Sequence, residues 1–313
     1  MTDTTSLPDS PLASSRAATL GGARIRDFWA LLKPGVMRLV VFTGLCGLLV
    51  APGSLHPFLA AVAVLCIAVG AGAAGAINMW YERDIDALMA RTRQRPVVRG
   101  RISPDDALAF GVVLSLASIA VMGLAVNWAA AALLALANGF YVFVYTMVLK
   151  RRTPQNIVIG GAAGAFPPMI GWAAVTGDIA WCSVILFGII FFWTPPHFWA
   201  LSLFACKDYE KAGVPMLPVT HGEAHTKKQI LFYSVLLLPI GFLPTLAGTA
   251  GWVYGTGALM LSGLMVLGAV EVWRDKGTVA ARRLFAYSIV YLFALFGLLV
   301  IDATHGPFGR VLQ

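Results

Sequence analysis

Apolar segments about twenty residues long recur along almost the whole chain and limit what it can fold into. A helix needs about 20 apolar residues to cross the hydrocarbon core of a bilayer, and within lipid its backbone must satisfy its own hydrogen bonds. Nine such segments lie near residues 37–54, 57–80, 106–125, 127–149, 155–175, 179–204, 230–249, 251–271 and 284–302. The sequence therefore predicts an all-α, polytopic membrane protein, a bundle of about nine transmembrane helices.

Charged residues are scarce and lie almost entirely on one side of this predicted bundle. They make up 12% of the chain, about half the share found in soluble domains. Of the lysines and arginines, five precede or open the first segment, six follow the second, three the fourth, four the sixth and four the eighth, and only Arg310 falls on the other side. The positive-inside rule then places the N-terminus and these loops in the cytoplasm. This topology, and not a nucleic-acid partner, explains the net charge of +8.

The N-terminal stretch differs in composition from the rest. Residues 1–30 are rich in Ser, Thr, Ala, Asp and Pro and lack the apolar core of a signal peptide, so we expect a disordered cytoplasmic tail. Residues 31–313 would then form a single transmembrane domain. The four cysteines show no CxxC spacing, so neither a disulfide framework nor a zinc site is indicated.

Two predicted cytoplasmic loops, 81–105 and 205–229, are much longer than turns require, and we expect both to cap one central cavity. At the start of the first loop, Asn78, Glu82 and Asp86 are four residues apart and share one helical face. Their oxygens suit Mg²⁺, which usually bridges a few carboxylates to substrate phosphates. The alternative is that these acids only solvate a helix end and pair weakly with nearby arginines.

Basic residues follow close behind this acidic face. Five arginines lie within residues 91–101, and two further cations close the fourth segment. Forked guanidinium hydrogen bonds can clamp a diphosphate. The candidates are Arg91, Arg95, Arg99, Lys150 and Arg151. A polybasic stretch beside a membrane also binds anionic lipid and fixes topology, and that interpretation stays open.

The sixth segment contains a histidine directly after a proline pair. Pro195 and Pro196 should break regular helix near the cytoplasmic rim, and His197 follows them. An ionisable group inside the membrane is a candidate functional residue. The alternative is a neutral imidazole bonded to a carbonyl that the prolines free. In the second loop, Asp208 belongs to a second acidic pair that neighbouring lysines could simply neutralise.

Together these motifs resemble the intramembrane, aspartate-rich prenyltransferase family, and in particular its haem-modifying branch. The matching stretches cover nearly the whole chain after the tail: Lys33-Pro-Gly-Val, Asn78-Met-Trp-Tyr with Asp84-Ile-Asp86, Arg91-Thr-Arg-Gln-Arg-Pro96, Tyr145-Thr with Leu149-Lys-Arg151, Pro195-Pro-His-Phe-Trp199 and Ala212-Gly-Val-Pro-Met-Leu-Pro218. The chain departs from the family pattern twice. Glu82 replaces the first Asp of NxxxDxxxD, and Ala212 stands where the second motif often has an acid, so the number of Mg²⁺ ions stays open.

The resemblance implies a nine-helix bundle around a cavity open to lipid, in the inner (plasma) membrane of a bacterium, capped by the two loops. It also implies transfer of a farnesyl group from farnesyl diphosphate to a vinyl group of haem B, with water adding the hydroxyl of haem O. Asn78, Glu82, Asp86 and Asp208 would be catalytic and hold Mg²⁺, and the cations would neutralise the departing diphosphate. His197 would bind haem through its iron.

Two other functions fit parts of the sequence. A transporter would also contain broken helices and intramembrane polar groups, but its ionisable groups tend to lie near the midplane and not at one rim. Another prenyltransferase would use a quinone precursor or a chlorophyllide as acceptor, and the run Pro195-Pro-His-Phe-Trp199 argues against it. Further partners would be a haem A synthase or oxidase-assembly proteins that receive the product.

Overall fold

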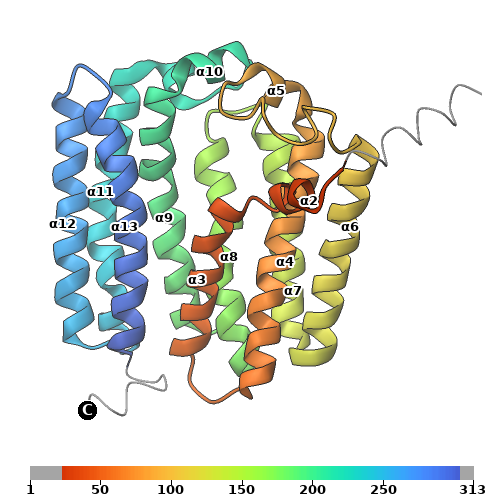
Figure 1. Ribbon diagram of the computed structural model, residues 1–313. Helices are drawn as coiled ribbons and strands as arrows, with labels where there is room; N and C mark the ends of the chain where they lie inside the picture. Colours follow the sequence, from red (N-terminus) through yellow and green to blue (C-terminus); the bar gives the residue numbers. More distant parts are fainter. Residues whose placement is uncertain (1–22, 304–313) are drawn as a thin grey trace, which may run out of the picture.

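Each apolar segment forms a long helix, and the helices run side by side (Figure 1). The structure is a computed structural model that describes residues 23–303. Its elements are α2 (Ile25–Leu31), α3 (Pro34–Val50), α4 (Pro57–Tyr81), α5 (Arg83–Leu88), α6 (Pro104–Val121), η1 (Met122–Val126), α7 (Trp128–Gly139), η2 (Phe140–Leu149), α8 (Asn156–Thr176), α9 (Trp181–Phe204), α10 (Cys206–Lys211), α11 (Leu217–Leu246), α12 (Trp252–Arg274) and α13 (Val279–Ile301). Residues 23–303 contain no β-strand, so the predicted all-α class is confirmed.

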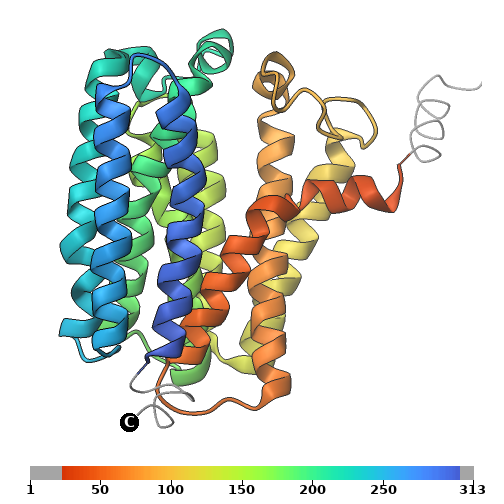
Figure 2. The same cartoon turned by 60° about the vertical axis from the view of Figure 1, so that its left-hand side comes forward.

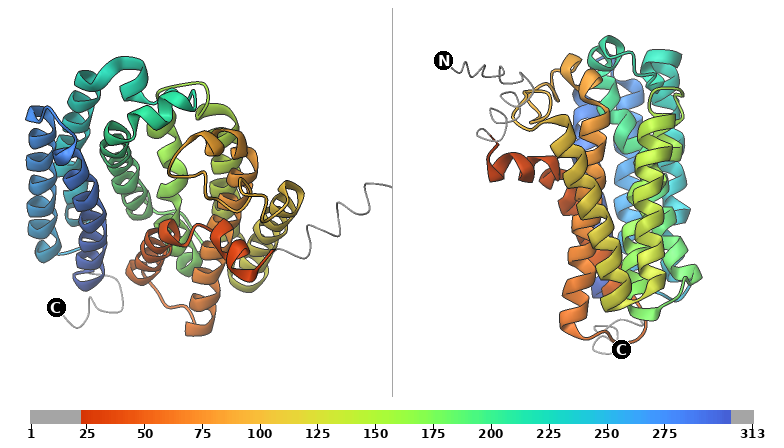
Figure 3. Two further views of the ribbon diagram at one scale, coloured as in Figure 1. Left: turned by 45° about the horizontal axis from the view of Figure 1, so that its top comes forward. Right: turned by 90° about the vertical axis from the view of Figure 1, so that its right-hand side faces the viewer.

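The number of possible membrane spans agrees with the sequence. Within the described range, eight helices are long and apolar enough to cross a bilayer, with α6 continuing into η1 and α7 into η2. The remaining predicted span is α3, which meets α2 at a bend of 57°. Because of this bend, α2 projects from the side of the bundle (Figures 2 and 3). A polytopic helical bundle is therefore confirmed, and its first span begins as a bent pair.

The long connections gather at one end of the bundle. α5 and α10 lie there together with the turns that follow η2 and α12, whereas the short turns 51–56 and 177–180 lie at the opposite end (Figures 1 and 3). Proline at the first position begins α3, α4 and α6, where its missing N–H costs no helical hydrogen bond. The four basic loops that the sequence places on one side therefore share one end. Arg310 lies outside the described residues.

Part of the predicted disordered tail is ordered. Residues 25–31 form α2, and at its start the backbone amide of Arg24 donates to the Asp27 carboxylate at 3.2 Å. Asp27 is buried and pairs with Arg101 at 2.9 Å, while Phe28 packs edge-on against Phe110 at 5.1 Å. The prediction of disorder is thus wrong for residues 25–30, because tertiary contacts hold a short helix that the composition did not reveal. Residues 1–22 lie outside the described residues.

The crossing of α3 and α8 depends on glycine. A Cβ at Gly47 would lie 2.0 Å from the carbonyl oxygen of Pro168, and a Cβ at Gly171 would lie 2.0 Å from the carbonyl oxygen of Gly44. No side chain fits at such distances, so the two backbones meet directly. Small residues allow this close approach between membrane helices, where packing drives association.

Two local expectations were wrong. The proline pair does not break α9, which runs from Trp181 to Phe204 with both prolines inside it. Packing against α8, α11 and α13 stabilises this helix, as neighbouring helices do for prolines in membranes. The second predicted loop is also shorter than expected, because helical structure already begins at Leu217 and is interrupted only by a kink at Gly222, where φ is 79°.

Candidate active site

The acidic face predicted from the sequence is buried at the loop end of α4. Asn78, Glu82 and Asp86 are exposed by only 2%, 1% and 1%. α4 ends at Tyr81, yet the amide of Glu82 still donates to the carbonyl of Asn78 at 2.9 Å, and that of Asp86 to the carbonyl of Glu82 at 2.8 Å. The helical hydrogen bonding thus continues across the junction with α5 and keeps the spacing that puts the three side chains on one face.

Each of these three side chains contacts one cation. The Lys33 ammonium donates to Asn78 Oδ1 at 2.5 Å, Lys150 pairs with Glu82, and Arg95 pairs with Asp86. The Asn78 amide also donates to Thr146 Oγ1 at 3.0 Å. Three separate parts of the chain, the start of α3, the end of η2 and the first loop, therefore supply the cations of one cluster.

The Glu82 carboxylate is held in its charged form. Burial alone would raise its pKa, but the neighbouring Lys150 and Lys33 outweigh this effect and lower the pKa below the ordinary value. One carboxylate oxygen, Oε2, contacts Lys150, while Oε1 is buried without a hydrogen-bond partner in the described part of the chain. A buried, charged acceptor without a partner is costly and is expected where a ligand or ion completes the site.

The oxygens present fit Mg²⁺ only together with a substrate. Among residues 23–303, no three His, Cys, Asp or Glu side chains come together as a metal site. Glu82 and Asp86 with the amide oxygen of Asn78 offer two carboxylates and one neutral oxygen, all hard ligands. Mg²⁺ is commonly held by one or two carboxylates plus substrate phosphates. The donor set is therefore suited to a Mg²⁺–diphosphate pair.

The remaining predicted diphosphate ligands are placed differently. Arg151 makes a two-pronged pair with Asp84, at 2.7 and 2.8 Å, and lies over the Tyr81 ring. Arg99 is exposed and donates to Gln94 at 2.9 Å, so the structure does not bring it to the buried acids. Arg91 lies beside the hydroxyl of Tyr209, in the other loop. Only Lys150 and Arg95 of the five predicted cations contact the acidic face directly.

The two long loops are joined by apolar contacts. Ile85 and Met89 from the first loop pack in one cluster with Tyr209, Val214 and Met216 from the second. Asp208 lies in α10 next to Tyr209 and is partly exposed, and its carboxylate has no hydrogen bond or ion pair to the residues that the structure describes. The structure thus supports one shared cap and leaves Asp208 free to meet a ligand.

His197 lies in a different environment, between α9 and α13. Its ring is stacked between Trp193 and Phe285, with centroid distances of 4.3 and 4.7 Å. Its Nδ1 lies 2.6 Å from the Ser288 hydroxyl, which itself donates to the carbonyl of Phe285 at 2.6 Å. A hydroxyl has one proton to donate, so Nδ1 must be the donor in this contact. The neutral ring then has its lone pair on Nε2, the form that can bind a metal.

The sequence did not single out Lys33 as a site residue. This lysine stands between α2 and α3 with φ 52° and ψ 57°, and it is the one non-glycine residue with positive φ in the described range. Such a conformation costs about 1–3 kcal/mol and persists where surrounding contacts enforce it. Here the bend turns the Lys33 side chain to Asn78. A cation directly before Pro34 was the available signal, but it was explained by topology.

Comparisons with known proteins place this arrangement in a family. The family model described as "UbiA prenyltransferase family" matches residues 40–298. A protein of Brucella anthropi named "Protoheme IX farnesyltransferase" is 57% identical, covering 92% of this chain and 93% of its own. One of Acidiphilium cryptum with the same name is 56% identical over 96% of this chain and 97% of its own.

Solved structures show the same fold at low identity. A UbiA homolog from Archaeoglobus fulgidus bound to GPP and Mg²⁺ superposes with a TM-score of 0.62 at 17% identity, covering 87% of this chain and 99% of its own. A structure described for digeranylgeranylglyceryl phosphate synthase gives 0.74 at 16% identity, covering 89% and 98%. With the family model and the near full-length relatives, these likenesses lead to one conclusion: the chain belongs to the UbiA prenyltransferase family.

Proposed function

We propose that this protein transfers a farnesyl group from farnesyl diphosphate to a vinyl group of haem B. The carbocation formed on the porphyrin side chain takes its hydroxyl from water, so that haem B, farnesyl diphosphate and water give haem O and diphosphate. The observation that carries this proposal is the buried face of Asn78, Glu82 and Asp86, each matched by a cation. The choice of haem as acceptor is supported by the names of the near full-length relatives.

Mg²⁺ would be held by Asn78, Glu82 and Asp86, with Asp208 contributing from the second loop. When bound, the metal supplies charge neutralisation to the leaving diphosphate. The partnerless Glu82 Oε1 supports this assignment. The buried acids also attract the cations that a diphosphate needs, so Lys33, Lys150 and Arg95 are already in position before any substrate binds.

The outer cations would have a lesser part. Arg91 lies at the junction of the two loops and can reach a diphosphate without breaking an ion pair. Arg151 would first have to leave Asp84, and Arg99 would have to leave Gln94. Lys150 and Arg95 are paired too, but with the acidic face itself, so they already lie where the diphosphate would bind. We therefore rank Lys33, Lys150, Arg95 and Arg91 as the principal diphosphate ligands and keep the other two predicted residues as secondary ones.

His197 would bind the haem iron through Nε2. The hydrogen bond to Ser288 fixes the tautomer, and Trp193 and Phe285 fix the ring plane, which together prepare an axial ligand. We place the protein in the bacterial inner membrane with the loop end in the cytoplasm, where a haem A synthase or oxidase-assembly proteins would receive the product.

The test is to supply the purified protein with haem B, farnesyl diphosphate and Mg²⁺ and to identify haem O by mass spectrometry. A quinone precursor and a chlorophyllide are offered in parallel, and prenylation of either one in place of haem would contradict the proposal. Haem binding is followed separately by the Soret band. His197→Ala should shift or abolish the bound-haem band, whereas His225→Ala, on the exposed start of α11, should leave it unchanged.

A further inference from the structure

The short helix α2 projects from the bundle where the first span begins, and one of its faces is held firmly (Figure 3). On this inner face, Asp27 is buried and pairs with Arg101 of the first loop at 2.9 Å. Phe28 lies edge-on to Phe110 of α6, with ring centroids 5.1 Å apart. These contacts to two different elements fix the rotation of α2 about its own axis, and therefore also the direction in which its other face points.

The outer face of α2 is apolar, exposed and bordered by arginine. Ile25 and Trp29 are one helical turn apart and share this face, and they are exposed by 91% and 62%. Arg26 lies about 100° round the helix from Ile25, and Arg24 immediately precedes the first turn. Both arginines are exposed, and neither makes an ion pair within residues 23–303. An apolar strip bordered by basic residues is typical of helices that lie in the boundary layer of a membrane.

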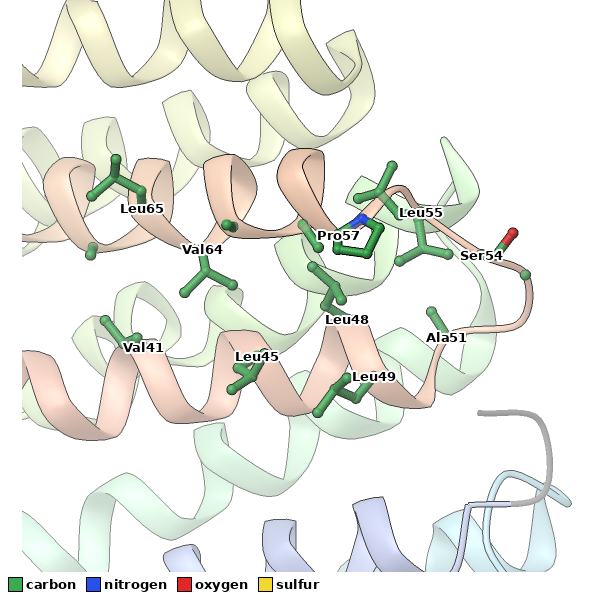
Figure 4. A pocket seen from close by; sticks show the side chains of 15 residues that line it. Val41, Leu45, Leu48, Leu49, Ala51, Ser54, Leu55, Pro57, Val64 and Leu65 are labelled. Atoms are coloured by element: carbon green, nitrogen blue, oxygen red, sulfur yellow. The ribbon is translucent and has the colours of Figure 1, made fainter. Parts of the chain in front are cut away.

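The far edge of the bilayer can be located on the two helices next to α2. An open groove between α3 and α4 is lined by apolar side chains such as Leu45, Leu49 and Val64, and Figure 4 shows Ser54 beyond them at the turn. Ser54 is the one residue with a polar side chain in this lining. The hydrocarbon core of the bilayer therefore ends near residues 51–56 on this side.

Helix lengths then place α2 at the other edge. α3 has 17 residues, which is about 25 Å at the rise of an α-helix, whereas the hydrocarbon core is about 30 Å thick. Lys33, directly before α3, packs beside Gly75, which lies eighteen residues after Pro57, or about 27 Å along α4. Both measures bring the start of α3 within about 5 Å of the hydrocarbon edge. α2 joins α3 there at a bend of 57°, and so lies where acyl chains meet headgroups.

We infer that α2 is a lipid-binding surface in this boundary layer, with Ile25 and Trp29 against the acyl chains and Arg24 and Arg26 bound to phosphates of anionic lipid. Tryptophan is enriched at this depth because its ring is apolar and its N–H is polar. A guanidinium binds phosphate by forked hydrogen bonds, and basic residues at a membrane surface attract anionic lipid. Neither haem nor a prenyl diphosphate takes part, so this role is independent of the proposed reaction.

The first test locates Trp29 by its fluorescence in lipid nanodiscs. The chain has nine tryptophans, so the emission of Trp29 is taken as the difference between the parent and Trp29→Phe. Lipid with brominated acyl chains should quench this emission, whereas acrylamide in the aqueous phase should have little effect. Trp181→Phe gives a matched reference, because Trp181 is also exposed and begins α9 at the opposite end of the bundle.

The second test uses the same signal to measure lipid selectivity. Brominated phosphatidylglycerol in a phosphatidylcholine nanodisc should quench Trp29 at a lower mole fraction than brominated phosphatidylcholine does. Arg24→Gln/Arg26→Gln should lower this preference about tenfold, the combined effect expected from two basic residues near a membrane surface. Lys276→Gln/Arg283→Gln also removes two exposed cations at the loop end and should keep the preference of the parent. Each variant is measured with and without Trp29→Phe.

Three results would overturn the inference. Quenching of Trp29 by acrylamide and not by brominated lipid would place α2 in water. Protection from both quenchers would mean that a second copy of the chain covers its outer face. Equal quenching by the two brominated lipids, or a preference for phosphatidylglycerol that persists without both arginines, would exclude Arg24 and Arg26 as ligands of lipid phosphate.

Discussion

The two loops that cap the bundle treat their acidic residues in opposite ways. In the first, Glu82 and Asp86 are fully buried and each faces a cation, whereas in the second, Asp208 is partly exposed and no ion pair joins it or Glu210 to a cation within residues 23–303. Ion pairs hold the two buried acids of the first loop, while Tyr209 of the second loop packs with Ile85 and Met89 in the apolar cluster that joins the loops. Acids near the start of two long loops can therefore be preorganised in one place and available in another, and the difference lies in the cations that reach them.

The largest effect is expected from the first loop. Asp86→Asn or Glu82→Gln should lower haem O formation by about 100-fold or more, since each replaces a carboxylate that we propose as a metal ligand with a neutral amide and so removes a preorganised charge. Turnover is measured across a Mg²⁺ titration, with haem binding as the check on folding. Near-normal turnover at any Mg²⁺ concentration would remove these residues from the site.

The next largest effect is on stability and is expected from Lys150, the cation that pairs with Glu82. Lys150→Met leaves Glu82 buried without its ion-pair partner and should destabilise the protein by about 2 kcal/mol. This is below the usual cost for breaking a buried pair, because Lys33 still lies near Glu82 and Lys150 is 16% exposed. Thermal unfolding in detergent measures the loss. The double variant Lys150→Met/Glu82→Gln should regain part of it, and no recovery would show that the pair is not coupled.

A smaller effect, on turnover and not on stability, is expected from the second loop. Asp208→Asn should lower turnover by about tenfold, in the range seen for weakened metal ligation. Because the carboxylate has no partner in the described part of the chain, the unfolding temperature should not change. A drop in stability together with unchanged turnover would show that Asp208 has a structural role and is not available to a ligand.

The smallest effect is expected from the exposed ion pair between Asp84 and Arg151. Asp84 is 60% exposed and pairs with Arg151, and exposed pairs contribute about 0–1 kcal/mol. Asp84→Asn should therefore change stability by about 0.5 kcal/mol at most and leave turnover close to that of the parent. A loss as large as that of Asp86→Asn would show that Asp84 takes part in binding the diphosphate.

The helices and the acidic face could be predicted because each depends on local periodicity. Apolar length gives the spans, and a spacing of four residues gives the shared face of Asn78, Glu82 and Asp86. The partners could not be predicted, because they depend on how distant segments pack. Five arginines lie within residues 91–101, and no sequence pattern says that Arg95 contacts Asp86 while Arg99 turns to Gln94.

Two features of the backbone could not be predicted from the sequence for a similar reason. Lys33 adopts a left-handed conformation because it lies at the bend between α2 and α3. From the sequence alone, it is only a basic residue that precedes a predicted span. The proline pair in α9 suggested a break, but the surrounding helices keep that element continuous.

The charged cluster also has a consequence for how the protein is made. All its contacts join residues between Lys33 and Arg151, in the first half of the chain. Synthesis proceeds from the N-terminus, and acids left alone inside a membrane are expensive. Glu82 meets its partner Lys150 only after the fourth span has entered the bilayer, so the first four spans form the smallest nascent unit that can bury both acids neutralised. The half of the bundle that contains His197 and Ser288 is then added to a charged cluster that is already assembled.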